Sequence, residues 1–473
     1  MYIPLICLQS GLKHKSRTKL QFLEHINHFL TSFCVFPLIL CLGGILTWKL
    51  RGLQFSSLGL SFRLMLNNQQ ERAASEGEGV SRYEAVAGML AGNFGTGNIA
   101  GMAIAIASGG PGALLWIWVV TLLAAIVQYA GAFLGCKHRQ FQAESQEYIG
   151  GPIACLGYKM KSRFLAVAFC IAGLITAFSA GNLVQVNCIV SLCADGFFPK
   201  ILVGILLALS VYPVLAGGNT RVLRFSAKAI PFVAGFYFLF SILVLSIHCD
   251  KIPLAFHLIF SSALGVKAGV AGIGGYTLGQ VISTGLNRAI MATDCGSGMV
   301  SILQSNSKSA NPVADGLVTL LPPVIVAAVC SITMLVLLVT GAYDSGELGV
   351  LMVMQAFKSS LGMLGGGVVL ISMILFGYTT ALSWFACAEK SLEYMIPGRR
   401  ANLLLKAIYL LVIPFGGVLG MQFIWALSDL GFCGMVIFNS ISLIALFKEV
   451  IATRYEVALL RKEANAQSDP LRQ

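Results

Sequence analysis

Two short runs of glycine and polar residues interrupt long apolar stretches of this sequence. The first is Ala91-Gly92-Asn93-Phe94-Gly95-Thr96-Gly97-Asn98, and the second is Ala292-Thr293-Asp294-Cys295-Gly296-Ser297-Gly298. Three glycines within six residues disfavour a continuous helix, because each costs about 1 kcal/mol relative to alanine. A helix that unwinds at membrane depth exposes N–H groups, which suit a carboxylate, and C=O groups, which suit a cation. The paired runs therefore predict a binding site, although glycine-rich helices can also simply pack closely.

Asp294 is a carboxylate in the middle of an apolar stretch. Placing a charge there costs at least ~2.5 kcal/mol, so such a residue needs a compensating role. It could hold a substrate ammonium group, bind a cation, or pair with Arg288 on the same helix. The spacing of six residues makes the last pairing awkward, since only neighbours three or four apart meet directly on a helix.

The composition defines the elements that must position these residues. Of 473 residues, 57% are hydrophobic and 11% are charged, and the mean hydropathy is +0.81. A soluble domain carries roughly 25% charged residues, so we predict an all-α polytopic membrane protein. Stretches of about 20 apolar residues can cross the membrane. We predict eleven: 28–48, 87–109, 113–136, 164–194, 200–217, 227–247, 277–304, 314–340, 361–387, 404–420 and 430–447.

The positions of the two interruptions divide the chain. Counted from the second apolar stretch, they fall in helices one and six of ten, which predicts two five-helix repeats at 87–247 and 276–447. We expect the remaining segments to be an N-terminal polar segment (1–27), an extra first transmembrane helix (28–48), a polar, amphipathic cytoplasmic connection (49–86), an extracellular loop (248–275) and a cytoplasmic tail (448–473). The tail after Arg454 is charged and poor in aromatic residues, so it is expected to be loose.

The net charge of +12 is distributed over alternate loops. With a cytoplasmic C-terminus, the inside loops at 49–86 and 137–163 are rich in Lys and Arg, whereas the outside loops at 109–113 and 421–429 have none. This pattern follows the positive-inside rule and not the clustered basic face of a nucleic-acid-binding protein. The basic residues near Lys13 disagree, because the same count places the N-terminus outside. Nothing in the sequence resembles a metal site or a nucleophile motif.

An ordered set of motifs covers the chain from about residue 85 to residue 447. It begins with GTGNIAGMAIAIASGGPGALLWIWVV from Gly95 to Val120. The further motifs are Gly150-Gly151-Pro152, Gly181-Asn182-Leu183-Val184-Gln185-Val186-Asn187, Asn311-Pro312-Val313, Leu382-Ser383-Trp384, Glu389-Lys390-Ser391-Leu392-Glu393-Tyr394 and Trp425-Ala426-Leu427-Ser428-Asp429. Together they closely resemble the alanine or glycine:cation symporter family, also called the sodium:alanine symporter family.

The resemblance implies a specific function. It implies an eleven-helix protein of the cell (inner) membrane with a five-plus-five inverted repeat and two broken helices. It implies import of small neutral amino acids by Na⁺ symport with alternating access. The substrates would be alanine or glycine, with serine or D-alanine as further candidates, and Na⁺ would be the coupling ion with no other cofactor. The protein would then not be an enzyme. A proton-coupled amino-acid permease on the same fold is the alternative.

The resemblance also implies the substrate site. Thr96, Gly97 and Asn98 match the unwound stretch whose N–H groups would bind the substrate carboxylate. Gln185 matches a glutamine that reaches the substrate. In the second broken helix, Met291 and Thr293 would face it, and Trp384 would close the pocket on the side-chain side. Without the resemblance, Gln185 could instead bond a neighbouring helix, and Met291 and Trp384 could serve in packing.

The cation site implied by the resemblance is made of oxygen ligands. The hydroxyls of Thr379 and Thr380 would join the backbone carbonyls of Ala91 and Phe94, with Asp294 as a further cation-binding residue. A threonine pair in a membrane helix, taken alone, more often bonds its own backbone.

Three departures from the family pattern leave the expected fold unchanged but leave the substrate range and strict Na⁺ coupling open. At Gln128 and Gly131 the family usually has Lys and Glu, so a charged pair is missing together, which is less damaging than loss of one partner. Ile153-Ala154-Cys155 replaces Met-Tyr-Tyr. Thr293-Asp294-Cys295-Gly296 replaces Asn-Glu-Ala-Gly.

Overall fold

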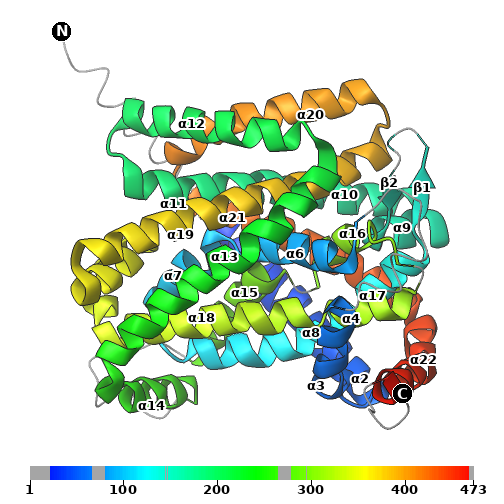
Figure 1. The fold of residues 1–473 in the computed structure, drawn as a ribbon, viewed down its shortest axis with the longest axis horizontal. Helices are drawn as coiled ribbons and strands as arrows, with labels where there is room; N and C mark the ends of the chain where they lie inside the picture. Colours follow the sequence, from blue (N-terminus) through cyan, green and yellow to red (C-terminus); the bar gives the residue numbers. More distant parts are fainter. Residues whose placement is uncertain are drawn as a thin grey trace.

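The computed structural model describes residues 22–66, 80–143, 145, 147–264, 278–294, 296–309 and 311–467. These residues are mostly helical, and they pack side by side in a bundle (Figure 1). Two short strands, β1 (Gln140–Gln142) and β2 (Glu147–Ile149), form an antiparallel hairpin in which Phe141 faces Tyr148. The predicted segments at residues 1–21, 67–79, 265–277 and 468–473 lie outside the described part of the chain.

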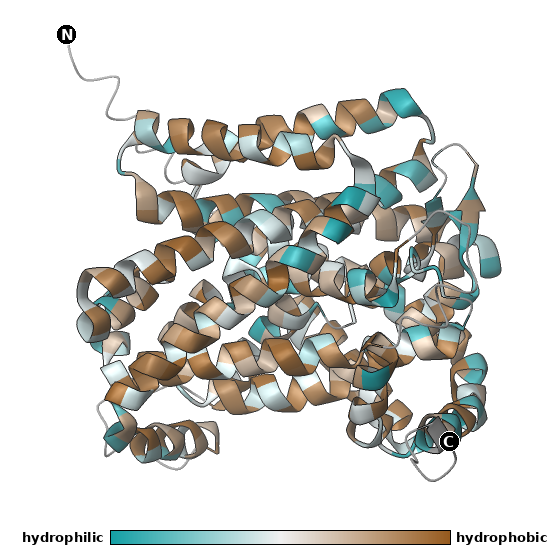
Figure 2. Ribbon diagram, in the orientation of Figure 1, coloured by the Kyte–Doolittle hydropathy of each residue, from teal (hydrophilic) through white to brown (hydrophobic). Residues whose placement is uncertain are grey.

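Within the described residues, nine helices are long and apolar enough to cross a membrane, and a bent pair adds a tenth. Figure 2 shows brown, hydrophobic residues along most of the length of the helices in the bundle. The nine are Phe22–Lys49, Ala113–Lys137, Arg163–Cys193, Phe197–Leu215, Gly218–Ile247, Pro312–Thr340, Val350–Met395, Arg399–Gly417 and Met421–Ala445. The prediction of an all-α polytopic membrane protein is therefore confirmed.

The first repeat follows an N-terminal helix and two short helices. The N-terminal elements are η1 (Leu30–Val35), α2 (Phe36–Lys49), α3 (Leu53–Ser56) and α4 (Leu58–Leu66). The first repeat contains α6 (Arg82–Asn93), η2 (Thr96–Asn98), α7 (Ala100–Gly109), α8 (Ala113–Lys137), α9 (Gly151–Ala154), η3 (Cys155–Lys159), α10 (Arg163–Phe178), η4 (Ser179–Leu183), α11 (Val184–Cys193), α12 (Phe197–Leu215) and α13 (Gly218–Ile247).

The second repeat follows a short helical connection. The connection contains η5 (Cys249–Lys251) and α14 (Ile252–Ala263). The second repeat contains α15 (Leu278–Thr293), α16 (Met299–Gln304), α17 (Pro312–Val318), α18 (Leu321–Thr340), η6 (Ala342–Asp344), α19 (Val350–Met395), α20 (Arg399–Val412), η7 (Ile413–Gly417) and α21 (Met421–Ala445), and α22 (Phe447–Gln467) ends the described chain. In α19, Gly362 has a φ of 61°, which separates two helical parts.

Both predicted interruptions are present as helix breaks. α6 starts at a capping box between Ser81 and Glu84, and it is bent by 58° from the Thr96–Gly109 segment that follows. The predicted stretch 277–304 consists of α15 and α16, each too short to cross a membrane alone. Between them Asp294 has a φ of 49°, in the left-handed region that a side chain disfavours by roughly 1–2 kcal/mol.

Two predicted boundaries are wrong. The expected outside loop at 421–429 is the beginning of α21, which starts nine residues earlier than predicted. Polar residues in its first turns, such as Ser428 and Asp429, lower the local hydropathy, yet Ser428 is fully buried against protein. Similarly, the basic residues Arg221 and Arg224 lie in the first turns of α13 and not in a loop before it.

The expectation of a loose tail is also wrong, because α22 continues to Gln467 and packs on the bundle. The carboxylate of Glu449 in α22 lies 2.8 Å from Lys137 Nζ, 3.0 Å from His138 Nε2 and 3.4 Å from Lys159 Nζ. The hydroxyl of Tyr129 in α8 donates to Thr453 at 2.8 Å. These partners are distant in sequence, so the composition of the tail could not reveal them.

Replacing Glu449 with glutamine is expected to loosen α22. Burial raises the pKa of Glu449, but hydrogen bonds from Lys137 and His138 outweigh it and lower the pKa to about 2, from an ordinary 4.5. The ionised carboxylate therefore stabilises the docked helix above about pH 4.5, and this contribution is lost as the pH falls towards 2. Because the lysine partners are largely exposed, we expect an effect of about 1 kcal/mol.

Tryptic cleavage at Arg461 measures this docking. At pH 7.5 the Glu449→Gln variant should be cut about 5-fold faster than the wild type, as 1 kcal/mol predicts. Glu456→Gln is the matched control, since Glu456 is an exposed residue of the same helix. Equal cleavage of all three proteins would contradict a role for Glu449.

Candidate functional site

Hydrogen bonds join the two helix breaks directly. Asn93, at the end of α6, donates from Nδ2 to the carbonyl of Thr293 at the end of α15, at 3.0 Å. Asn98 donates from Nδ2 to the carbonyl of Asn93, so it bridges its own break. Both asparagines are buried. The structure thus brings two interruptions 200 residues apart into one polar region inside an apolar bundle.

Gln185 of α11 occupies the N–H end of the first break. Its Oε1 accepts hydrogen bonds from the backbone N–H and the hydroxyl of Thr96, both at 2.9 Å. Its Nε2 donates to the carbonyl of Ala180 at 2.8 Å. A Cβ added at Gly97 would have no heavy atom within 4 Å, so there is open space beside this backbone. The Gln185 oxygen therefore occupies the position in which the predicted substrate carboxylate would accept a hydrogen bond from the Thr96 N–H.

The two threonines of α19 differ in their contacts. Thr380 donates its hydroxyl proton across to the carbonyl of Ala91 at 2.8 Å, which ties α19 to the end of α6. Thr379 donates to carbonyls of its own helix, those of Leu375 at 3.0 Å and Phe376 at 3.1 Å. Phe94, whose carbonyl was predicted as a ligand, packs its ring on Phe376. Thr380 and Ala91 are thus brought together as predicted, whereas Thr379 bonds its own backbone.

Asp294 is buried at the second break with an incomplete set of partners. Its Oδ2 has no hydrogen-bond partner among the described residues, and its side chain makes no salt bridge there. Arg288 pairs with Asp429 of α21 at 3.6 Å, so it does not neutralise Asp294. Two further buried oxygens near the breaks, Asn93 Oδ1 and Ser383 Oγ, also lack a described partner. Unpaired buried oxygens of this kind suit a bound cation or proton.

Trp384 and Met291 lie on the α21 side of the breaks. The Trp384 ring packs edge-on against Phe432 at 5.5 Å between centroids. A Cβ at Gly181 would stand 2.2 Å from the Trp384 Cβ, so glycine is needed for this close approach. The Met291 sulfur accepts a hydrogen bond from Arg288 at 3.5 Å, and Met291 lines a small cavity with Phe432. Among the described residues, no hydrogen bond joins Met291 to the Thr96 backbone.

Each broken helix carries an arginine that pairs with a distant acid. Arg82, the first residue of α6, lies 3.3 Å from Asp315 of α17, and both side chains are buried. Arg288 of α15 pairs with Asp429 and also stacks on the Trp425 ring at 4.6 Å. These ion pairs link each broken helix to neighbouring elements on one side of its break.

Sequence reasoning missed several residues that support the site. Ser383 carries an unpaired hydroxyl, and Asn439 of α21 donates to the carbonyl of Gly296 in the second break at 2.8 Å. Gly181 admits Trp384. Ser383 and Gly181 were quoted as motif residues, and a polar residue such as Asn439 inside an apolar span is a signal that could have been used.

At positions 128 and 131, where the family usually has Lys and Glu, this chain has the uncharged residues Gln128 and Gly131. Gln128 donates from Nε2 to the carbonyl of Thr319 at 2.7 Å. A Cβ at Gly131 would stand 2.9 Å from the hydroxyl of Ser301 in α16, so α8 and α16 approach closely at this glycine. Close packing therefore replaces the missing pair.

A helical membrane protein with two broken helices, meeting at a buried polar site, has the architecture of a secondary transporter. Residues 16–469 match the model of the sodium:alanine symporter family, and the chain belongs to that family. The predicted resemblance is thereby confirmed.

Individual proteins agree with this assignment. The chain is 31% identical over 447 residues to the sodium/alanine symporter AgcS of Methanococcus maripaludis, covering 92% of this chain and 97% of that one. It is 30% identical over 451 residues to YrbD of Bacillus subtilis, a putative sodium/proton-dependent alanine carrier, covering 91% and 90%. The solved structure of MhsT with L-phenylalanine matches with a TM-score of 0.56 at 16% identity, covering 80% of this chain and 99% of MhsT. This likeness confirms the five-plus-five inverted-repeat fold.

Proposed function

We propose that this protein imports alanine or glycine by Na⁺ symport with alternating access. The observation that carries the proposal is the polar region at the two breaks, which offers backbone N–H groups at one end and unpaired oxygens at the other. A zwitterionic amino acid and a small cation together match these two ends. The membrane would be the cell membrane, with a cytoplasmic C-terminus.

The substrate carboxylate would bind the N–H groups of Thr96, Gly97 and Asn98. To do so it must replace Gln185 Oε1 at the Thr96 N–H and the Gly95 carbonyl at the Asn98 N–H, after which Gln185 Oε1 is free to contact the substrate. The open space beside Gly97 gives the carboxylate room. Trp384, held close to Gly181, restricts the volume on the side-chain side, which favours a small amino acid.

The cation would bind among oxygens at the other end. The carbonyl of Ala91 and the hydroxyl of Thr380 already lie 2.8 Å apart, and the Thr380 oxygen retains lone pairs for an ion. Phe94 O and Thr379 Oγ1 complete the proposed set. Asp294 supplies the negative charge, because a buried carboxylate without a neighbouring cation is stabilised by binding one. Opening and re-forming of the Arg82–Asp315 and Arg288–Asp429 pairs would accompany alternating access.

Uptake of radiolabelled alanine and glycine into proteoliposomes tests the proposal. The wild type should accumulate substrate only with an inward Na⁺ gradient and not with K⁺. Asn98→Leu and Thr380→Val should each reduce the initial rate at least about 30-fold, or about 2 kcal/mol. Thr340→Val is the matched control, since Thr340 bonds only its own helix. Rates unchanged in both site variants would contradict the assigned positions.

Proton coupling is the second candidate. The unpaired Oδ2 of Asp294 supports it, because one proton would neutralise this carboxylate as a cation does. Uptake driven equally by a proton gradient in the absence of Na⁺ would favour this alternative.

A further inference from the structure

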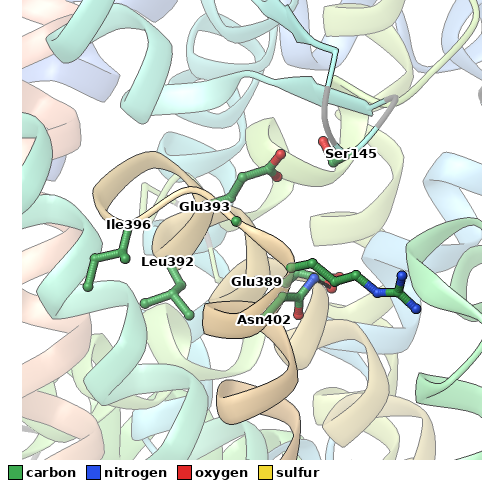
Figure 3. Close-up of a pocket in the computed structure, with 8 residues that line it drawn as sticks. Ser145, Glu389, Leu392, Glu393, Ile396 and Asn402 are labelled. Atoms are coloured by element: carbon green, nitrogen blue, oxygen red, sulfur yellow. Dashed lines mark hydrogen bonds between the residues drawn. The ribbon is translucent and has the colours of Figure 1, made fainter.

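A second cavity lies outside the helix breaks, where α19 turns into α20 beside the β1–β2 hairpin. It encloses about 180 Å³ and is shown in Figure 3. Glu389 and Glu393 line it from α19, Arg399 from the first turn of α20, and Ser145 from the hairpin turn. Figure 3 shows the Glu393 carboxylate between α19 and Ser145. Cavities for drug-sized ligands measure roughly 300–1,000 Å³, so this one suits a smaller solute.

The charges around the cavity are separated. Lys390 is fully buried, and its ammonium group contacts two carboxylates, Glu147 of the hairpin at 2.6 Å and Glu393 at 3.2 Å. One cation for two anions leaves an excess negative charge at Glu393. Glu389 is already matched, because Lys406 lies 3.5 Å from it and Asn402 donates a hydrogen bond to it.

The opposite side of the cavity has an excess positive charge. Arg399 makes no salt bridge with any carboxylate in the described part of the chain. It is also the first residue of α20, a 14-residue helix with no side-chain cap, so unpaired backbone N–H groups and the positive helix end add to its charge. Leu392 and Ile396 supply an apolar wall between the two charged sides. The lining thus combines the Glu393 carboxylate, the Arg399 guanidinium and a small apolar surface.

We propose that this cavity is a second binding site for a small zwitterionic α-amino acid. The ammonium group would contact Glu393, the carboxylate would contact Arg399 and the N–H groups of α20, and a small side chain would lie on Leu392 and Ile396. A bound ligand would connect α19 with α20, beside the hairpin, at the end of the molecule predicted to be cytoplasmic. The choice of ligand rests on the proposed function, since it is the class of solute that the protein would deliver to that side.

Equilibrium binding of radiolabelled L-alanine to the purified full-length protein, with and without Na⁺, tests the proposal. The wild type should bind two equivalents per chain in Na⁺. Arg399→Gln should retain only the Na⁺-dependent equivalent, whereas Asn98→Leu should retain only a Na⁺-independent one. The double variant should bind none. Arg400→Gln is the matched control, because Arg400 neighbours Arg399 but does not line the cavity.

Competition defines the ligand chemistry at this site. In the Asn98→Leu protein, glycine and L-serine should displace alanine, whereas propionate or ethylamine, each with only one of the two charges, should not. Glu393→Gln should weaken the Na⁺-independent binding at least about 10-fold, equivalent to 1.4 kcal/mol. Displacement by ethylamine alone would overturn the zwitterion assignment.

The outcomes separate the two proposals. If Arg399→Gln binds as much alanine as the wild type, or if Asn98→Leu binds none, the second site is disproved while the central site stands. If Asn98→Leu binds as the wild type does and all binding is lost in Arg399→Gln, the second site stands and the central assignment fails.

Discussion

Replacing Asp294 with asparagine is expected to reduce cation-driven alanine uptake about 100-fold, a loss of about 2.7 kcal/mol. Asparagine has nearly the same shape, so the break should retain its fold while losing its negative charge. Asp294 Oδ2 has no described partner, and the nearest arginine along the chain is held by Asp429. Under the proposed function this carboxylate would bind the coupling cation, and its removal would leave that cation without a counter-charge.

Variants of Asp294 also distinguish Na⁺ coupling from proton coupling. Initial uptake rates are measured with a Na⁺ gradient and, separately, with a proton gradient. If Na⁺ is the coupling ion, Asp294→Glu should retain part of the Na⁺-driven uptake. Asp344→Asn is the control, since Asp344 is an exposed acid outside the breaks. Wild-type Na⁺-driven uptake by Asp294→Asn would remove Asp294 from the cation site.

Replacing Arg82 with alanine is expected to have the largest effect on stability. The Arg82–Asp315 pair is buried, and Asp315 also accepts hydrogen bonds from Gln304 at 3.1 Å and Ser307 at 3.4 Å. Removing one partner of a buried pair leaves an uncompensated charge, which costs about 3–5 kcal/mol. The link between α6 and α17 would be lost with it.

Thermal unfolding of the detergent-solubilised protein measures this effect as a lower Tm. The matched control is Arg224→Ala in α13, which removes a more exposed pair with Glu84 of α6. Such surface pairs contribute about 0–1 kcal/mol. The double variant Arg82→Met with Asp315→Leu should recover much of the lost stability, since no buried charge then remains. A Tm of Arg82→Ala equal to that of Arg224→Ala would show that the buried pair does not stabilise the fold.

The helix breaks illustrate what could be predicted locally. Glycine and polar residues within an apolar stretch act on the backbone of that stretch alone, so both breaks could be located from the sequence. The start of α21 could not be located in this way. A hydropathy window scores Ser428 as hydrophilic, although its side chain is buried against protein. The docking of α22 was not predicted because it depends on contacts between distant segments. Glu449 pairs with Lys137 of α8 and Lys159 of η3.

The sequence by itself determined the class of protein, the apolar stretches, the two breaks and, through its motifs, the family. Each of these properties is encoded in contiguous residues, because membrane burial and helix unwinding depend on local composition. Only the tertiary structure decided that Gln185 accepts a hydrogen bond from the Thr96 N–H and that Arg399 lines a cavity with Glu393. It also decided that Arg288 pairs with Asp429, so that Asp294 has no basic partner among the described residues. These choices join residues from different helices, and which partner a buried polar group meets depends on how the helices pack.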